Sequence, residues 1–169
     1  MKGNGATARR SQRPAQGAPH APAALIVRPC RKSDLKPLLF FFDAVLRRDY
    51  FLRRGQLEEL VRGPHHRVFV AELDAVLVGV AVLTRGTRLV NALVHPAYRG
   101  LGIGRALIRG GGATEVRAKI DMSSGDPRGF YRSLGFITTG LRNGKGNIEL
   151  MRLPKRLRAE MARGSAKCE

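Results

Sequence analysis

The chain has 169 residues, 43% of them hydrophobic and 26% charged, which is typical of one globular domain and excludes collagen, coiled coils and disulfide-rich scaffolds. Its apolar runs, such as Leu38–Phe42, are far shorter than the ~20 residues of a membrane span, so we expect no membrane contact. The N-terminus has no apolar segment typical of a signal peptide, and the two cysteines lie outside any Cys/His cluster. These features favour a cytoplasmic protein with free thiols and without a metal.

The formal net charge of +18 is the outstanding compositional feature. Residues 1–24 hold four basic and no acidic side chains, and residues 152–169 hold six basic and two acidic ones. Such a surplus attracts polyanions such as nucleic acid or a phosphate-bearing cofactor. It is equally well explained by arginine serving as the default exposed residue, and both interpretations stay open.

The first third of the chain predicts a basic arm followed by a strand and two helices. Residues 1–24 are rich in proline, glycine and alanine and lack aromatic residues, which indicates a flexible segment. A strand over Ala24–Cys30 is stopped by Pro29, and Ser33 is positioned to cap a helix that runs towards Arg48. A shorter helix is expected over Gln56–Val61.

The rest of the chain alternates strands with helices. Two of its strands join through the tight turn Asp74-Ala75 and therefore predict an antiparallel hairpin. The expected strands are 67–73, 76–84, 87–95, 118–122, 136–141 and 147–153. The expected helices are 101–116, weakened by the run Gly110–Gly112, and 127–134. This order indicates one α+β domain over residues 25–153, with a basic tail over residues 154–169.

The segment Asn91–Ile108 carries the chemistry, because a strand, a glycine-containing loop and a helix follow one another there. Glycines let backbone N–H groups approach a ligand, and a helix N-terminus offers free donors and a positive dipole end. Together they predict a pyrophosphate site. The loop lacks the Lys-Ser/Thr pair of a Walker loop, and its glycine spacing does not fit the dinucleotide fingerprint.

The pattern Arg99-x-x-Gly102-x-Gly104 resembles the GNAT superfamily of acyl-CoA-dependent N-acyltransferases. The segment Phe130–Phe136, a helix with a tyrosine leading into Gly-Phe, is similar to the family's second signature. The order of elements from Ala24 to Leu153 also matches, so the resemblance covers most of the chain. It implies a mixed, mostly antiparallel central sheet with flanking helices.

The resemblance also implies a role for each part of this segment. The loop amides would hold the pyrophosphate of acetyl-CoA, and the backbone of the preceding strand would pair with the pantetheine arm. The residues implied in cofactor binding are Leu93, Val94, Arg99, Gly100, Leu101, Gly102, Ile103, Gly104, Arg105 and Ser124. Tyr131 would protonate the leaving thiolate, for which a phenol with a pKa of ~10 is a competent donor. The implied reaction is the direct transfer of an acetyl group to a primary amine.

Two positions depart from the family's pattern. Many members have asparagine where this chain has Ser124, and a glutamate base where it has Lys119. Asp121, two residues further along the same strand face, is the candidate general base, with Glu72 in reserve. We interpret His95 as a structural residue of the loop.

Two alternatives remain at this stage. The basic arms favour a nucleic-acid-associated acetyltransferase whose acceptor is aminoacyl-tRNA or another polyanion-bound amine, while the missing glutamate and asparagine favour a non-catalytic CoA-binding domain. The acceptor side implied by the family is basic here, which disfavours a polycationic acceptor; its residues are Arg47, Arg48, Arg53, Arg54, Arg142 and Lys145. Monomer and homodimer are equally compatible with the sequence.

Overall fold

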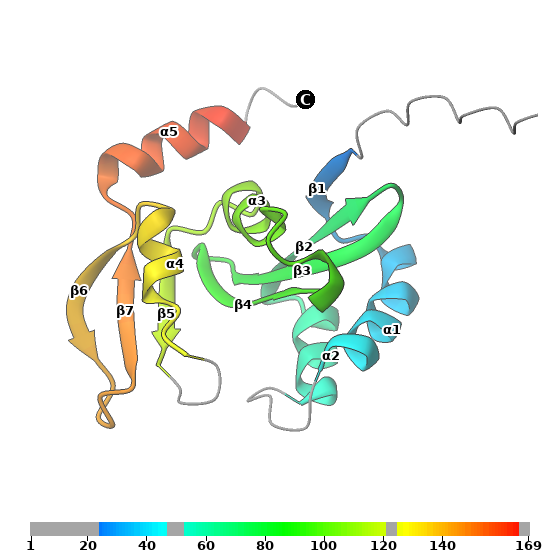
Figure 1. Cartoon of the computed structure of the whole chain (residues 1–169), viewed down its shortest axis with the longest axis horizontal. Helices are drawn as coiled ribbons and strands as arrows, with labels where there is room; N and C mark the ends of the chain where they lie inside the picture. The colour runs from blue at the N-terminus through cyan, green and yellow to red at the C-terminus, as the bar shows by residue number, and fades with distance from the viewer. Residues whose placement is uncertain (1–23, 47–52, 121–124, 166–169) are drawn as a thin grey trace, which may run out of the picture.

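The computed structural model describes residues 24–46, 53–120 and 125–165. A seven-stranded sheet has the order β1-β2-β3-β4-β5-β7-β6 (Figure 1). Every neighbouring pair is antiparallel except β4 and β5, which are parallel. The strands are β1 Leu25–Pro29, β2 His66–Leu73, β3 Val76–Thr84, β4 Arg88–Val94, β5 Glu115–Lys119, β6 Ile137–Arg142 and β7 Ile148–Arg152. The helices are η1 Lys32–Asp34, α1 Leu35–Val45, α2 Arg54–Arg62, η2 Pro96–Tyr98, α3 Ile103–Gly110, α4 Arg128–Ser133 and α5 Lys155–Ser165.

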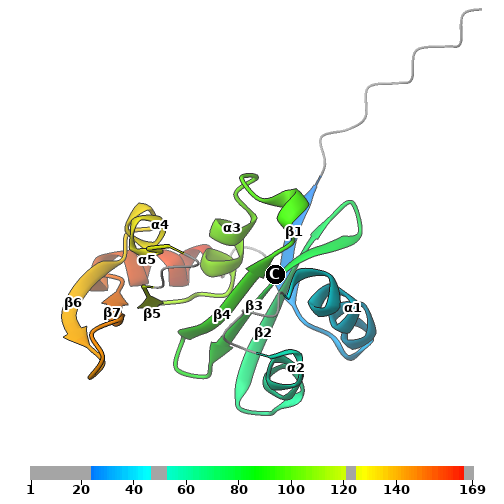
Figure 2. The same ribbon diagram turned by 60° about the horizontal axis from the view of Figure 1, so that its bottom comes forward.

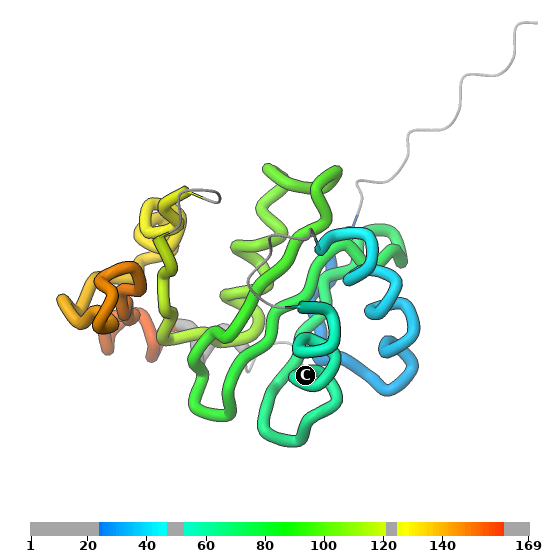
Figure 3. Tube along the Cα trace, turned by 90° about the horizontal axis from the view of Figure 1, so that it is seen from below, coloured from blue at the N-terminus to red at the C-terminus, as the bar shows by residue number. Residues whose placement is uncertain are grey.

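Helices cover the two faces of the sheet and bury a separate apolar cluster on each. Helices α1 and α2 pack against one face with the cluster that contains Phe42, Leu57, Val80 and Leu93. Helix α3 lies on the opposite face, where its Leu107 is fully buried. Figures 2 and 3 show α1 and α2 on one side of the sheet and α3 on the other. The sequence accounts for this arrangement because β3, buried on both faces, is a nearly continuous run of valine, alanine and leucine.

Glycine and turn residues set the local geometry of the sheet. Asp74 and Ala75 both have positive φ, at 49° and 64°, as a two-residue hairpin turn requires. A Cβ at Gly79 would lie 2.9 Å from Leu107 Cδ1 and 3.1 Å from the Leu93 carbonyl oxygen. Glycine at this position therefore lets α3 pack directly on β3.

The structure confirms the α+β class with a mostly antiparallel sheet and corrects two local expectations. Ser33 caps no helix: it lies inside η1, and the Asp34 carboxylate accepts the Arg31 N–H at 2.6 Å instead. Helix α3 does not continue through the glycines to Val116, because it ends at Gly110, and Val116 belongs to β5. None of the helices in the described ranges is long and apolar enough to cross a membrane.

Candidate active site

Strands β4 and β5 meet only at their first residues and then separate. Arg88 pairs with Glu115 and Leu89 pairs with Val116, and the described part of the chain shows no further pair between the two strands. A hydroxyl–hydroxyl contact of 2.6 Å between Thr87 and Thr114 closes the joined end. The backbone edge of β4 at Leu93 and Val94 pairs with β3 on one side, and β5 does not take up the other. The two strands therefore splay apart beyond their first two residue pairs.

The glycine loop lies at the end of β4, as the sequence predicts. Gly100 and Gly102 have φ values of +82° and +77°, and a Cβ at either position would meet no atom within 4 Å. Gly102 immediately precedes α3, and its carbonyl accepts the N–H of Ala106. The N–H groups of Ile103, Gly104 and Arg105 precede that first helical hydrogen bond and have no partner within the helix. Open space beside a row of donors at a positive helix end fits an anionic group such as a pyrophosphate.

The flanking side chains of the loop have different roles. Arg99 and Leu101 are exposed on the loop, Leu101 at 61%. Arg105 donates two hydrogen bonds of 3.3 Å to the carbonyl and hydroxyl oxygens of Ser133, which ties the start of α3 to the end of α4. Arg99 is thus available at the rim, whereas Arg105 also has a structural role.

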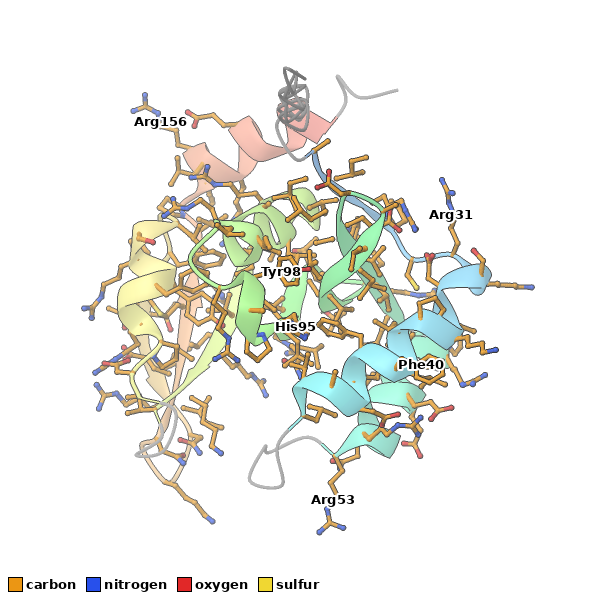
Figure 4. The ribbon with its side chains drawn as sticks, turned by 45° about the vertical axis from the view of Figure 1, so that its right-hand side comes forward. Arg31, Phe40, Arg53, His95, Tyr98 and Arg156 are labelled. Atoms are coloured by element: carbon orange, nitrogen blue, oxygen red, sulfur yellow. The ribbon has the colours of Figure 1, made fainter. Side chains whose placement is uncertain are left out.

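His95 shapes the turn between β4 and the loop. Its Nδ1 accepts the N–H of Ala97 at 3.2 Å, and its ring packs edge-on against Tyr98 with 5.5 Å between ring centroids. Figure 4 shows the two side chains next to each other. These contacts support the interpretation of His95 as a structural residue of the loop.

Tyr131 lies on α4, in the aromatic group that carries the second sequence signature. It is half-buried, packs on the cluster of the α3 face, and has its ring centroid 5.4 Å from that of Phe130 and 6.0 Å from that of Phe136. Phe130 in turn lies against the start of α3, since a Cβ at Gly104 would be 3.5 Å from its Cζ. Helix α4 therefore brings Tyr131 into the neighbourhood of the glycine loop.

A buried carboxylate that sequence reasoning missed anchors α4 to the sheet. Glu149 on β7 is only 4% exposed, and it accepts hydrogen bonds from Arg128 Nη1 at 3.1 Å and from the hydroxyl of Thr138. These hydrogen bonds, led by that from Thr138, lower the pKa of Glu149 below its usual value. Arg128 also binds Asp126, and a single guanidinium thereby links the start of α4 to β7. The signal in the sequence was an acidic residue two positions before the buried Met151 on the same strand face.

Two of the predicted site residues cannot be placed. Asp121 and Ser124 lie outside the described residues. Glu72, the reserve base, forms an ion pair with Arg28, which also binds Asp34 at 2.6 Å. Its strand β2 is separated from β4 by β3, so Glu72 is remote from the splayed edge. In the ranges that the structure describes, no three His, Cys, Asp or Glu side chains form a potential metal site.

Comparison with known proteins agrees with this geometry. Residues 64–138 match the family described as acetyltransferase (GNAT) domain. No sequence among curated proteins matches the chain.

Solved structures share the fold at low sequence identity. The ribosomal-protein-S18-alanine N-acetyltransferase of Escherichia coli is 18% identical, with a TM-score of 0.57 over 78% of this chain and 94% of that one. A putative GNAT acetyltransferase from Desulfovibrio desulfuricans is 21% identical, with a TM-score of 0.57 over 77% and 98% of the two chains. The PaiA N-acetyltransferase of Thermoplasma acidophilum, solved in complex with coenzyme A, is 16% identical, with a TM-score of 0.53 over 77% and 98%.

The glycine loop and the tyrosine helix both fall within the matched residues. Residues 64–138 thus match the GNAT acetyltransferase family, and the described chain shares the fold of solved N-acetyltransferases.

Proposed function

We propose that the chain transfers the acetyl group of acetyl-CoA directly to a primary amine, with Tyr131 as the general acid. The observation that carries this proposal is the separation of β4 from β5 beside a glycine loop that opens α3. That separation leaves the backbone of Leu93 and Val94 accessible to a pantetheine arm, and the loop from Gly100 to Arg105 presents N–H donors to a pyrophosphate. When bound, acetyl-CoA supplies an activated acyl group and a thiolate leaving group.

The residues of the chain have separate tasks in this reaction. The loop amides and Arg99 hold the anionic end of the cofactor, and the edge of β4 orients its arm. Tyr131 delivers a proton to the thiolate sulfur as it leaves, and its packing against Phe130 and Phe136 restricts where the phenol points. Asp121 is the proposed acceptor of the amine proton.

The test is a measurement of acetyl-CoA binding by calorimetry together with thiol release against a panel of amines. The panel includes amino acids, peptides, polyamines and aminoacyl-tRNA. We expect micromolar binding and thiol release with at least one amine. Binding without turnover on any amine would favour a non-catalytic CoA-binding domain, and absence of binding would refute the proposal.

Nucleic-acid association is the second candidate, favoured by the net charge of +18 and the basic arms at both ends of the chain. In this proposal the arms, residues 1–24 and 154–169, bring a polyanion-bound acceptor to the domain. Affinity for such an acceptor is expected to fall steeply with salt, whereas turnover of a small neutral amine is expected to change little.

A further inference from the structure

A hollow of about 330 Å³ lies on the second half of the sheet, away from the glycine loop. Its lining comes from β5, from β7 and from the end of β6: Arg117, Leu141, Arg142, Asn143, Ile148 and Leu150. The volume is at the small end of the range for ligand pockets, ~300–1,000 Å³, so it suits a group of the size of an amino acid or a dipeptide.

Strand alternation decides which face the hollow occupies. Val116, Ala118 and Met151 are buried in the cluster beneath α3 and α4. Arg117 and Leu150, which pair with each other, therefore point to the opposite face, the one that carries α1 and α2 on the first half of the sheet.

The hollow also lies at the end of the sheet where β4 and β5 have separated. Its residue Ile148 pairs with Lys119, the last residue of β5 and the one farthest from the joined end. Figure 1 shows this end of β5, the β6–β7 hairpin and α2 along the same edge of the molecule. The hollow thus borders the opening from which an acceptor reaches the splayed strands.

Among the described residues, the lining is cationic and apolar and includes no acidic side chain. The Arg117 side chain is exposed, and its guanidinium forms no ion pair or hydrogen bond with any residue that the structure describes. Arg142 lies 3.8 Å from the buried Glu149 and keeps half of its side chain exposed. The amide of Asn143 is already used within the hairpin, because it donates to Asn147 and accepts from Ile148. The charge available to a ligand is therefore that of Arg117, supplemented by Arg142, above an apolar floor of Leu141, Ile148 and Leu150.

We propose that this hollow selects an acceptor amine that carries a carboxylate beside an apolar group, with Arg117 as the residue that binds the carboxylate. The proposal rests on the proposed function and names its substrate class. A guanidinium with no competing acid pairs with a planar carboxylate through two parallel hydrogen bonds, a geometry that an ammonium or amide ligand cannot reproduce. An aliphatic side chain next to the carboxylate fits the floor, while a polyamine is repelled by both arginines.

The experiment compares acceptors that differ only in the carboxylate. Thiol release is measured with Ala-Leu and with Ala-Leu amide, and with a longer peptide amide that has aspartate or asparagine as its third residue. The first pair tests a terminal carboxylate and the second a side-chain carboxylate. We expect the KM of the preferred acid to be at least tenfold lower than that of its neutral partner.

Variants then assign the preference to the hollow. Arg117→Met is expected to raise the KM of the acid about tenfold or more. The KM of the amide and the affinity for acetyl-CoA are expected to stay unchanged. Arg117→Lys, which keeps the charge, is expected to raise the KM of the acid less than Arg117→Met does. Arg109→Met removes the same charge from an exposed residue of α3 outside the hollow, and it is expected to change neither KM.

Different outcomes separate this inference from the proposed function. Equal turnover of acid and amide, or an acid preference that survives Arg117→Met, would overturn the inference and leave the acetyltransferase intact. If no amine is acetylated, the binding of N-acetyl-leucine and of its amide is measured by NMR. Selective binding of the acid that is lost in Arg117→Met would support the site. Absence of such selective binding would overturn the inference. The chain could instead self-associate through this face. Self-association that Leu141→Glu abolishes and that N-acetyl-leucine does not affect would assign the hollow to a second copy of the chain and would also overturn the inference.

Discussion

The ion-pair cluster of Arg28, Asp34 and Glu72 allows a stability prediction with a calculable size. The Arg28 guanidinium bridges two carboxylates, is itself only 18% exposed, and holds the pKa of Asp34 at about 2 instead of 3.8. At 1.36 kcal/mol per pKa unit, this shift corresponds to about 2 kcal/mol of native-state stability at neutral pH. Arg28→Met removes that contribution and leaves the two carboxylates without their common partner.

The sign of the pH dependence follows from the lowered pKa of Asp34. The contribution is complete above pH ~5, where Asp34 is ionised in the folded and unfolded chain alike, and it is lost as the pH falls from there through about 2. The stability gap between wild type and Arg28→Met should therefore shrink across this window. At pH 7 we expect the variant to melt about 4–8 °C lower, since ~1 kcal/mol shifts the Tm of a chain of this size by ~2–4 °C.

The assay is urea unfolding followed by circular dichroism at several pH values from 7 to 2. Arg31→Met is the matched control, because it removes the same charge three residues away while its backbone N–H still bonds Asp34. Figure 4 shows that the Arg31 side chain points outward. A gap that stays constant between pH 5 and pH 2, or an equal loss in Arg31→Met, would refute the reasoning.

The remaining predictions concern the site. Tyr131→Phe keeps the packed ring but removes the proton donor, so its kcat should fall about 10- to 1,000-fold while its affinity for acetyl-CoA stays unchanged. The control Tyr98→Phe should have little effect on either quantity. Turnover of Tyr131→Phe within twofold of wild type would show that Tyr131 is structural. Gly102→Val strains a left-handed residue and fills the open space beside the loop, so acetyl-CoA binding measured by calorimetry should be lost. Gly112→Val, which has a similar φ of +69° and equally open surroundings, should bind normally, and equal loss in both variants would point to strain alone. A chain that starts at Ala23 should acetylate a small amine as well as the full chain does. It should lose affinity only for polyanions, and only at low salt. Loss of turnover of the small amine would contradict this prediction.

The parts of the fold that the sequence predicted well are those in which local pattern and packing agree. The β2–β3 hairpin follows from two apolar runs around Asp74-Ala75, and the structure places the turn at those two residues. The glycine loop was readable because glycine is the residue that most readily adopts the positive φ found at Gly100 and Gly102. Helix α3 was predicted too long because helical spacing at Ile103 and Leu107 continues formally to Val116, while the following glycines favour an end at Gly110.

Other parts of the site depend on contacts between distant segments and have no local signature. Glu149 is held by Arg128 and Thr138, which lie 21 and 11 positions away, and only the packing of α4 on β7 brings them together. The apolar neighbours Val116 and Ala118 could have indicated that Arg117 points to the opposite face of the sheet, where the hollow lies. That no carboxylate of the described residues pairs with its guanidinium became visible only once the strands were in register.

The short seam between β4 and β5 also bears on how the molecule opens. Because these strands share two residue pairs while β2 and β3 pair along most of their length, the backbone hydrogen bonds that join β5, β7 and β6 to the rest are few. We expect the amide protons of these three strands to exchange with solvent together, and earlier than those of β2 and β3. A ligand that contacts both β4 and β5 would slow amide exchange most in β5, β6 and β7. The exchange rates of β5 and β7 would therefore report how fully the cofactor and the acceptor bridge β4 and β5.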